Sequence, residues 1–156
     1  MTAADIVSGG GWVSDPPGEW VSSTPAVYQG AVYVGADETY DPLNPPNAWL
    51  HKLNDANGLV AWSKDYEHST STSSPAVADS KVYTWASTGA TASIYAYDLD
   101  GTPRWSKLVH QTGFSNGGVG ISVAISGGYL FASNGHQTAD PGYPETYPFL
   151  FAIKDP

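Results

Sequence analysis

The chain has 156 residues, a formal charge of −9 and a sequence pI near 4.5, and it contains no cysteine. The acidic charge argues against nucleic-acid and anionic-membrane partners, and the lack of cysteine excludes disulfides, thiolate metal sites and cysteine nucleophiles. The first residues, MTAADIVSGGGW, carry no Lys or Arg and no long apolar run, so we expect no signal peptide there, and no apolar run is long enough for a membrane-spanning helix. The cellular compartment stays open.

Short strands are predicted along the whole chain. Aromatic residues make up 13% of it, and 17 Gly and 12 Pro supply turns, while no window keeps a helical apolar period. Apolar runs bounded by Gly, Pro, Asn, Asp or Ser predict strands at 26–28, 31–35, 50–54, 59–63, 76–78, 82–86, 94–99, 103–107, 123–126, 129–133 and 149–153. The fold class is therefore predicted to be all-β.

These strands recur as a unit. The sequence TPAV at 24–27 returns as SPAV at 74–77, a Val-Tyr pair follows each at the same distance, and the pairs Gly58/Trp62 and Gly101/Trp105 end two units. Four short antiparallel strands repeating about every 40–50 residues are typical of β-propeller blades. A sandwich of eleven strands is the alternative, but it would not require a repeat.

The unit boundaries predict one propeller-type domain with incomplete ends. Trp12 precedes Pro25 by the same distance that separates Trp62 from Pro75. We therefore expect an orphan outer strand in 1–20, a first blade in 21–65, a second in 66–108, and a third in 109–156 that lacks its last strand. Because closed propellers have about 4–8 blades, the chain is either part of a longer propeller or half of a homodimer. In that homodimer, the strand near Trp12 completes the third blade of another copy and gives a six-bladed ring.

The second unit resembles the quinoprotein-like (PQQ-type) β-propeller repeat. That repeat has a Ser-Pro-Ala-Val entry, a Val-Tyr second strand and an Ala-x-Asp-x-x-Thr-Gly-x-x-x-Trp end. Ala96, Asp98, Gly101 and Trp105 keep this end with a turn one residue shorter, whereas the third unit keeps only Ala152 and has Lys154 in place of Asp. The resemblance implies that the closing tryptophans pack between adjacent blades: Trp12, Trp62 and Trp105. It also implies that long connections on one face of the ring bind ligands.

Two long connections, 36–48 and 134–148, carry the candidate site residues. Asp37, Glu38 and Asp41 offer the hard oxygen ligands that calcium prefers, or they form a solvated acidic loop. His136, Asp140 and Glu145 suit acid–base chemistry or a metal, or belong to a polar loop made rigid by prolines. Aromatic residues in and near both loops suit sugar stacking or loop packing: Tyr40, Trp49, Tyr143 and Tyr147. No catalytic residue or metal ligand is assigned.

The predicted function is a non-catalytic scaffold or binding module whose two long loops hold a protein, peptide or glycan. The alternative is a fragment or relative of a quinoprotein dehydrogenase, which would use PQQ and calcium with an Asp base and often a vicinal disulfide. No cysteine is present for that disulfide, and no matching Asp can be placed. A glycan hydrolase would require two carboxylates roughly 5–10 Å apart.

Overall fold

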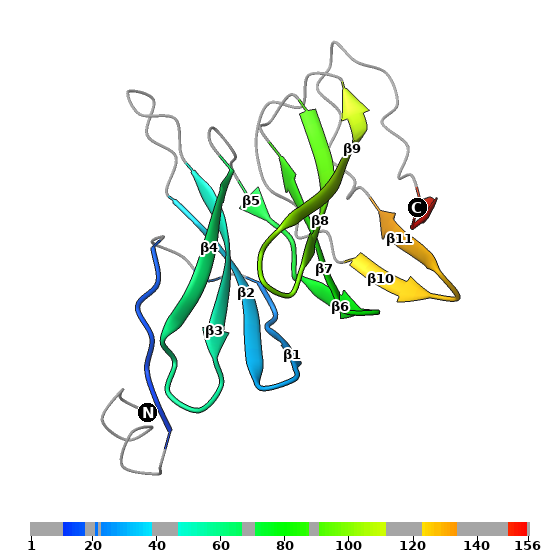
Figure 1. The fold of residues 1–156 in the computed structure, drawn as a ribbon. Helices are drawn as coiled ribbons and strands as arrows, with labels where there is room; N and C mark the ends of the chain where they lie inside the picture. The colour runs from blue at the N-terminus through cyan, green and yellow to red at the C-terminus, as the bar shows by residue number, and fades with distance from the viewer. Residues whose placement is uncertain are drawn as a thin grey trace.

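The computed structural model describes residues 11–17, 21, 23–38, 47–66, 71–87, 91–111, 123–133 and 150–155. This part of the chain is all-β, as predicted, with its strands in three antiparallel sheets and no helix among them (Figure 1). Over the same residues, no helix is long and apolar enough to cross a membrane.

The three sheets follow the order of the chain. The first contains β1 (Ala26–Tyr28), β2 (Ala31–Asp37), β3 (Ala48–Asn54) and β4 (Val60–Tyr66), paired in that order. The second contains β5 (Ser71–Thr72), β6 (Ala76–Ala78), β7 (Lys81–Ser87), β8 (Thr91–Asp98) and β9 (Pro103–Gln111), with β5 and β6 both paired to β7. The third contains β10 (Val123–Ser126), β11 (Tyr129–Ser133) and β12 (Leu150–Lys154).

Each of the eleven strands predicted between residues 26 and 153 overlaps a strand of the structure, and β5 is the strand that the sequence did not predict. It was missed because a two-residue Ser-Thr strand has no apolar pattern to detect. Residues 11–17, expected to be an outer strand, form no strand. A strand is defined by hydrogen bonds to a neighbour, and none of the described residues pairs with this segment.

Each sheet contains a hairpin whose two strands are joined by a two-residue turn. Gln29-Gly30, Asp79-Ser80 and Gly127-Gly128 join β1 to β2, β6 to β7 and β10 to β11, and all six residues have positive φ between 47° and 76°. Positive φ at both central positions is the type I′ pattern, whose twist matches that of antiparallel strands. This turn explains why the Ala-Val and Val-Tyr runs of the first two units, and the runs 123–126 and 129–133 of the third, form hairpins.

The second sheet is buried on both faces, because successive residues of a strand point to opposite sides. Tyr83, Trp85 and Ile94 form one core with Val123, Leu130, Ala132 and Ile153 of the third sheet. On the opposite face, Val82, Ala86 and Tyr97 form a second core with Ala31, Tyr33, Leu50 and Tyr66 of the first sheet. The sheets therefore stack face to face in chain order.

Candidate functional site

The first and second sheets have a turn end and a loop end. The short turns lie at one end of these sheets, and the strand ends that border the segments 39–46, 67–70 and 88–90 lie at the other (Figure 1). The described parts of the loop 36–48 are thus at the loop end, where the sequence analysis placed the ligand face.

At the base of the loop 36–48, two acidic residues lie where the loop leaves and rejoins the sheet. Asp37 ends β2, pairs with Ala48 and is buried. The Glu38 N–H donates to the Asn47 carbonyl, and the Asn47 N–H donates to Glu38 Oε2, both at 3.0 Å. The Glu38 carboxylate therefore holds the two ends of the loop together.

Most of the predicted ligand residues lie outside the described residues: Tyr40, Asp41, His136, Asp140, Tyr143, Glu145 and Tyr147. Trp49 is described and is buried within β3, opposite Ala36. Within the described ranges, no three His, Asp or Glu side chains come together as a metal site would require.

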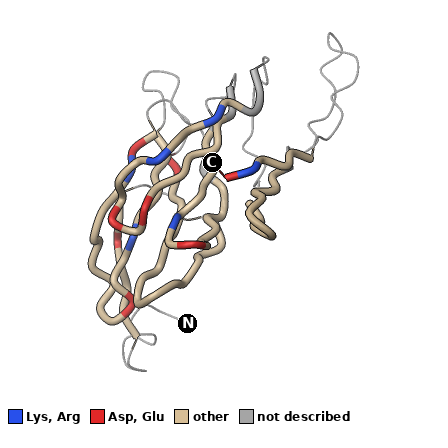
Figure 2. The backbone as a smooth tube through the Cα atoms, turned by 45° about the vertical axis from the view of Figure 1, so that its right-hand side comes forward, with Lys and Arg blue, Asp and Glu red and all other residues tan. Residues whose placement is uncertain are grey.

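The positive charges are mostly engaged within the molecule. The chain has six Lys and Arg residues, which are spread along the strands and do not form one patch (Figure 2). Lys52 Nζ donates to the Leu99 carbonyl at 2.8 Å and lies 5.8 Å from the centre of the Tyr33 ring. Lys64 Nζ lies 5.7 Å from the rings of both Trp62 and Tyr97. An anionic ligand would find few cations free to bind it.

Polar contacts connect each sheet to the next, and we call each such contact region a joint: in every joint a tryptophan of one segment donates a hydrogen bond to the following sheet. In the first joint, the Trp62 indole N–H on β4 donates to the carbonyl of Leu99, in the turn that follows β8, at 3.1 Å. A Cβ atom placed on Gly101 of that turn would lie 3.2 Å from Trp62 Cγ, and Gly101 has a φ of +89°. The Gly of the Gly-x-x-x-Trp pattern thus makes room for the tryptophan of the preceding sheet.

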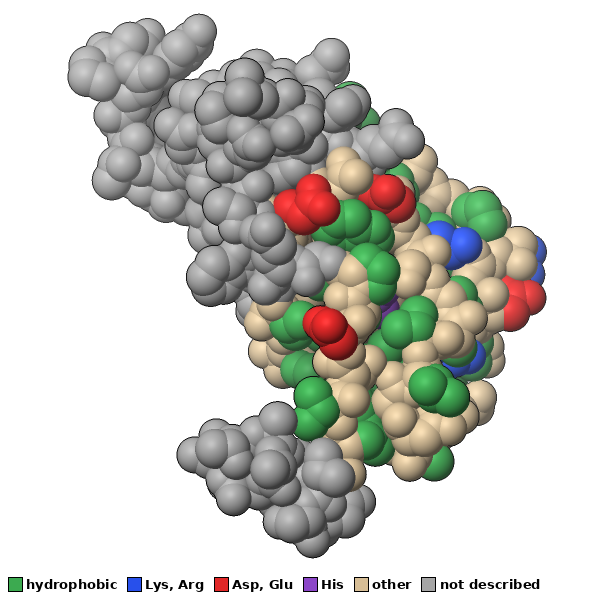
Figure 3. Space-filling model, turned by 90° about the vertical axis from the view of Figure 1, so that its left-hand side faces the viewer, with side chains coloured by type: hydrophobic (Ala, Val, Ile, Leu, Met, Phe, Trp, Pro, Cys, Tyr) green, Lys and Arg blue, Asp and Glu red, His purple; other side chains and the backbone are tan. Residues whose placement is uncertain are grey.

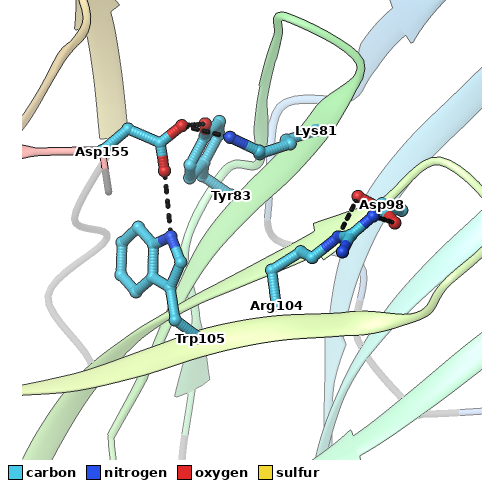
Figure 4. Close-up of polar contacts among 6 residues, drawn as sticks. All are labelled: Lys81, Tyr83, Asp98, Arg104, Trp105 and Asp155. Carbon is cyan, nitrogen blue, oxygen red and sulfur yellow. Dashed lines mark hydrogen bonds and ion pairs between the residues drawn. The ribbon is translucent and has the colours of Figure 1, made fainter.

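The second joint places a carboxylate at the position equivalent to Leu99. Asp155 Oδ1 accepts from the Trp105 indole N–H at 2.9 Å, and Oδ2 accepts from the Tyr83 hydroxyl at 3.0 Å and from the Lys81 ammonium (Figure 4). Burial raises the pKa of Asp155, but the hydrogen bonds from Lys81, Trp105 and Tyr83 outweigh burial and hold this pKa below its usual value. Both oxygens are occupied, so Asp155 serves as a structural acceptor.

Arg104 and Asp98 form a separate ion pair near this joint. Arg104 Nε donates to Asp98 Oδ1 at 2.6 Å, and Nη2 contacts Oδ2 (Figure 4). Asp98 is the last residue of β8 and Arg104 is the second residue of β9, so the two flank the turn between these strands, and Arg104 is largely exposed. The pair therefore connects the two sides of this turn and, because it is exposed, contributes little to the stability of the protein.

A third joint of the same kind connects residues 11–17 to the first sheet. The Trp12 indole N–H donates to the Asp55 carbonyl at 2.6 Å, and a Cβ atom on Gly58 would clash with the Trp12 ring. Asp55, Leu99 and Asp155 are equivalent, because each is the second residue after the last apolar position of its strand pattern. Trp12, Trp62 and Trp105 therefore donate to the equivalent residue of three successive sheets, the first two to its main-chain carbonyl and the third to its side chain.

A buried histidine secures the segment 11–17. His51 on β3 is fully buried, with Nε2 2.8 Å from the Pro17 carbonyl and Nδ1 2.7 Å from Ser63 Oγ. Because a carbonyl only accepts, Nε2 carries the proton and Nδ1 accepts from the Ser63 hydroxyl in the neutral ring. Burial lowers the pKa of His51, and the bond to Pro17 opposes this only in part.

Two serines explain the Ser-x-Pro-Ala-Val entry of the repeat. Ser23 Oγ accepts from the Gly35 N–H at 2.7 Å, and Ser73 Oγ accepts from the Trp85 N–H at 3.0 Å, at equivalent positions of β2 and β7. The Thr24 N–H also donates to Ser74 Oγ at 2.8 Å, which links the two motifs. The repeat motif predicts a strand entry but not these hydrogen bonds, although the Ser two residues before each Pro is a usable signal.

Comparison with protein-family models and with curated proteins finds no match to this chain.

Proposed function

We propose that the three sheets are neighbouring blades of a quinoprotein-like β-propeller that acts as a non-catalytic scaffold or binding module. The observation that carries this proposal is the repeated joint, in which Trp12, Trp62 and Trp105 donate to the equivalent residues Asp55, Leu99 and Asp155. One contact repeated from sheet to sheet supports a radial or linear repeat architecture more than a sandwich, whose two sheets have no such serial relation.

The non-catalytic part of the proposal rests on how the described polar groups are used. The Asp155 carboxylate, the Lys81 ammonium and the His51 ring all face partners within the protein. Catalytic acids, bases and nucleophiles need a free reacting side. We therefore assign ligand binding to the loops 36–48 and 134–148, with a glycan, peptide or protein as the bound partner.

A loop exchange tests the assignment of the ligand face. The segment 134–148 is replaced by the short second-unit connection 88–90, and both chains are screened on glycan and peptide arrays. The parent chain is expected to bind and the exchanged chain to lose binding while its thermal unfolding stays cooperative. A matched control changes the turn end through Ser80→Gly and should bind as the parent does. Equal binding by the parent and the exchanged chain would reject this loop as the site.

The alternative, a PQQ- and calcium-dependent quinoprotein dehydrogenase or a part of one, is tested by titration. PQQ is added with calcium and followed by its absorbance, and we expect no saturable binding at one molecule per chain. Tight stoichiometric binding that is lost when calcium is chelated would favour the dehydrogenase. This result would not depend on the outcome of the array screen.

A further inference from the structure

The outer face of the third sheet is exposed, although the equivalent faces of the first and second sheets are buried. Leu50 and Ile94 hold equivalent strand positions, opposite Gly35 and Trp85, and both are 0% exposed. Leu150 holds the same position opposite Ser133 and is 75% exposed. A repeat that buries this position twice leaves it open in the third sheet.

The exposed face is apolar at its centre and polar at its turn end, where Ser126 and Lys154 pair with Tyr129. Tyr129 is 43% exposed and lies 6.4 Å from the Phe131 ring, which stands where Tyr33 and Tyr83 are buried. Ala124 and Ala152 share this face with Leu150, because they pair with Phe131 across both neighbouring strands. A contiguous apolar sheet face of this kind marks an interaction surface.

The first sheet exposes an apolar side chain on the face that would meet the third sheet of another chain. Val27 on β1 is 69% exposed, whereas Val77 and Ile125, its equivalents in the other sheets, are partly buried at the sheet joints. Figure 3 shows hydrophobic side chains among few carboxylates on the side of the molecule that lies to the left in Figure 1. On this side of the first sheet, residues 11–17 contact β3 through His51, so the region beside β1 is the part left for a further sheet.

We infer that the third sheet of one chain packs on the first sheet of a second copy. Residues 11–17 of the second copy then pair with β12 and form the fourth strand of that third sheet. This inference rests on the proposed interpretation of the sheets as blades, and it does not depend on the ligand-binding loops. A twofold axis would repeat the joint and close a ring of six sheets, within the usual range of about 4–8 blades. The joint continues the two joints inside the chain, which is why the occupant is another copy.

The internal joints also give the register of the added strand. Trp62 lies opposite Lys52, and Trp105 lies opposite Ala96, at equivalent positions of β3 and β8. The same register places Trp12 of the second copy opposite Ala152 of the first chain and Ser14 opposite Leu150, as Lys64 lies opposite Leu50. Directly opposed residues in antiparallel strands have Cα atoms about 4.5–5.5 Å apart, which is within reach of a disulfide.

Light scattering coupled to size-exclusion chromatography measures the assembly. The 156-residue chain is expected to elute at twice its mass of 16.5 kDa. Leu150→Asp places a charge in the proposed interface and should return the mass to that of one chain with circular dichroism unchanged. Leu108→Asp is the matched control, since Leu108 is 50% exposed on β9 in the second sheet, and it should stay dimeric. A monomeric parent chain, or an open series of larger species, would overturn the inference.

Cysteine pairs test the register, because the chain has no cysteine of its own. Ser14→Cys with Leu150→Cys, oxidised by oxidised glutathione, should give a covalent dimer on non-reducing gels. Asp15→Cys with Leu150→Cys shifts the pair to opposite strand faces and should give much less. Equal cross-linking of both pairs, or a dimer from Leu150→Cys alone, would overturn the register. A dimer that binds nothing on the arrays would reject the ligand proposal and leave this inference standing.

Discussion

The joint between the first and second sheets and the joint between the second and third share one geometry but differ in chemistry. The Tyr33 and Trp62 rings are 6.0 Å apart at 53°, and the Tyr83 and Trp105 rings are 6.1 Å apart at 53°. In the first joint, Trp62 and Lys52 both donate to the Leu99 main-chain carbonyl. In the second, the acceptor is the side chain of Asp155.

This difference shows which part of a joint the fold determines and which part the residue determines. In the first joint a main-chain carbonyl of the turn accepts from the tryptophan, and in the second joint the side chain at the equivalent position accepts instead. The Asp155 carboxylate accepts from Tyr83 and Lys81 as well as from Trp105, which makes three donors where the Leu99 carbonyl has two. We expect the carboxylate also to make the second joint sensitive to pH and to substitution of its acceptor residue, because the acceptor of the first joint is a main-chain carbonyl.

The largest effect is expected from removing the tryptophans. Trp62→Ala and Trp105→Ala should each lower the free energy of unfolding by about 3 kcal/mol, the lower end for Trp→Ala because both rings are only partly buried. Urea denaturation measures this. Trp62→Phe and Trp105→Phe keep a ring and lose one N–H donor, so each should lose only about 1 kcal/mol. Losses below about 1 kcal/mol for both alanine variants would show that the joints do not hold the sheets together.

Asp155→Asn should break the second joint selectively. It leaves Lys81 without its ion-pair partner and should cost about 1–2 kcal/mol, less than for a fully buried charge because the Asp155 side chain is 19% exposed. Asp55→Asn is the matched control, because Asp55 accepts from Trp12 through its main chain and should change stability little. Equal losses in the two variants would mean that the carboxylate of Asp155 has no special part.

Acid should weaken the second joint before the first. The pKa of Asp155 is lower in the folded protein than in the unfolded chain, so its contribution is fully present above the unfolded value, about 3.9. That contribution is lost as pH falls through the folded pKa. The difference in unfolding free energy between the parent and Asp155→Asn should therefore shrink on acidification below about pH 4. A difference that stays constant down to pH 2 would argue against an ionised Asp155 in the joint.

A smaller and distinct pH effect is expected where Trp12 meets the first sheet. The pKa of His51 is lower in the folded state than the unfolded value of 6.5, so the unfolded chain binds a proton more readily. Stability should therefore fall as pH drops below about 6.5, and His51→Gln should remove that part of the slope. Thermal unfolding between pH 7.5 and 5.5 measures it. An unchanged slope in His51→Gln would place the titrating group elsewhere.

The smallest effect concerns a turn. Ser80 has a φ of +61°, in a position where Gln29-Gly30 and Gly127-Gly128 have Gly. Ser80→Gly should stabilise the protein by about 0.5 kcal/mol, since relief of the left-handed strain slightly exceeds the added entropy of the unfolded chain. A Gly128→Ser variant is the reverse control and should be destabilised. The melting temperature should rise in Ser80→Gly and fall in Gly128→Ser.

The sequence predicted the strands and their repeat but not the chemistry of the joints. The Ala-Val and Val-Tyr runs located the hairpins to the residue in several strands, because alternating apolar residues and turn formers are local signals. The Asp155 site was missed because the repeat pattern places an Asp one residue earlier, where Lys154 stands. Its partners Lys81 and Tyr83 lie more than 70 residues away and meet it only through sheet stacking. The ligand residues of the loop 134–148 stay predictions.

The repeated tryptophan contact also bears on how such a chain can change length. In each joint the donor belongs to one unit and the acceptor to the next, 37 to 50 residues further along. The second unit carries both, with Leu99 accepting from the unit before it and Trp105 donating to the unit after it. A tandem duplication of that unit would meet a compatible neighbour at each end. Whole-unit gain or loss is then the mutation that this fold accommodates with the least new chemistry.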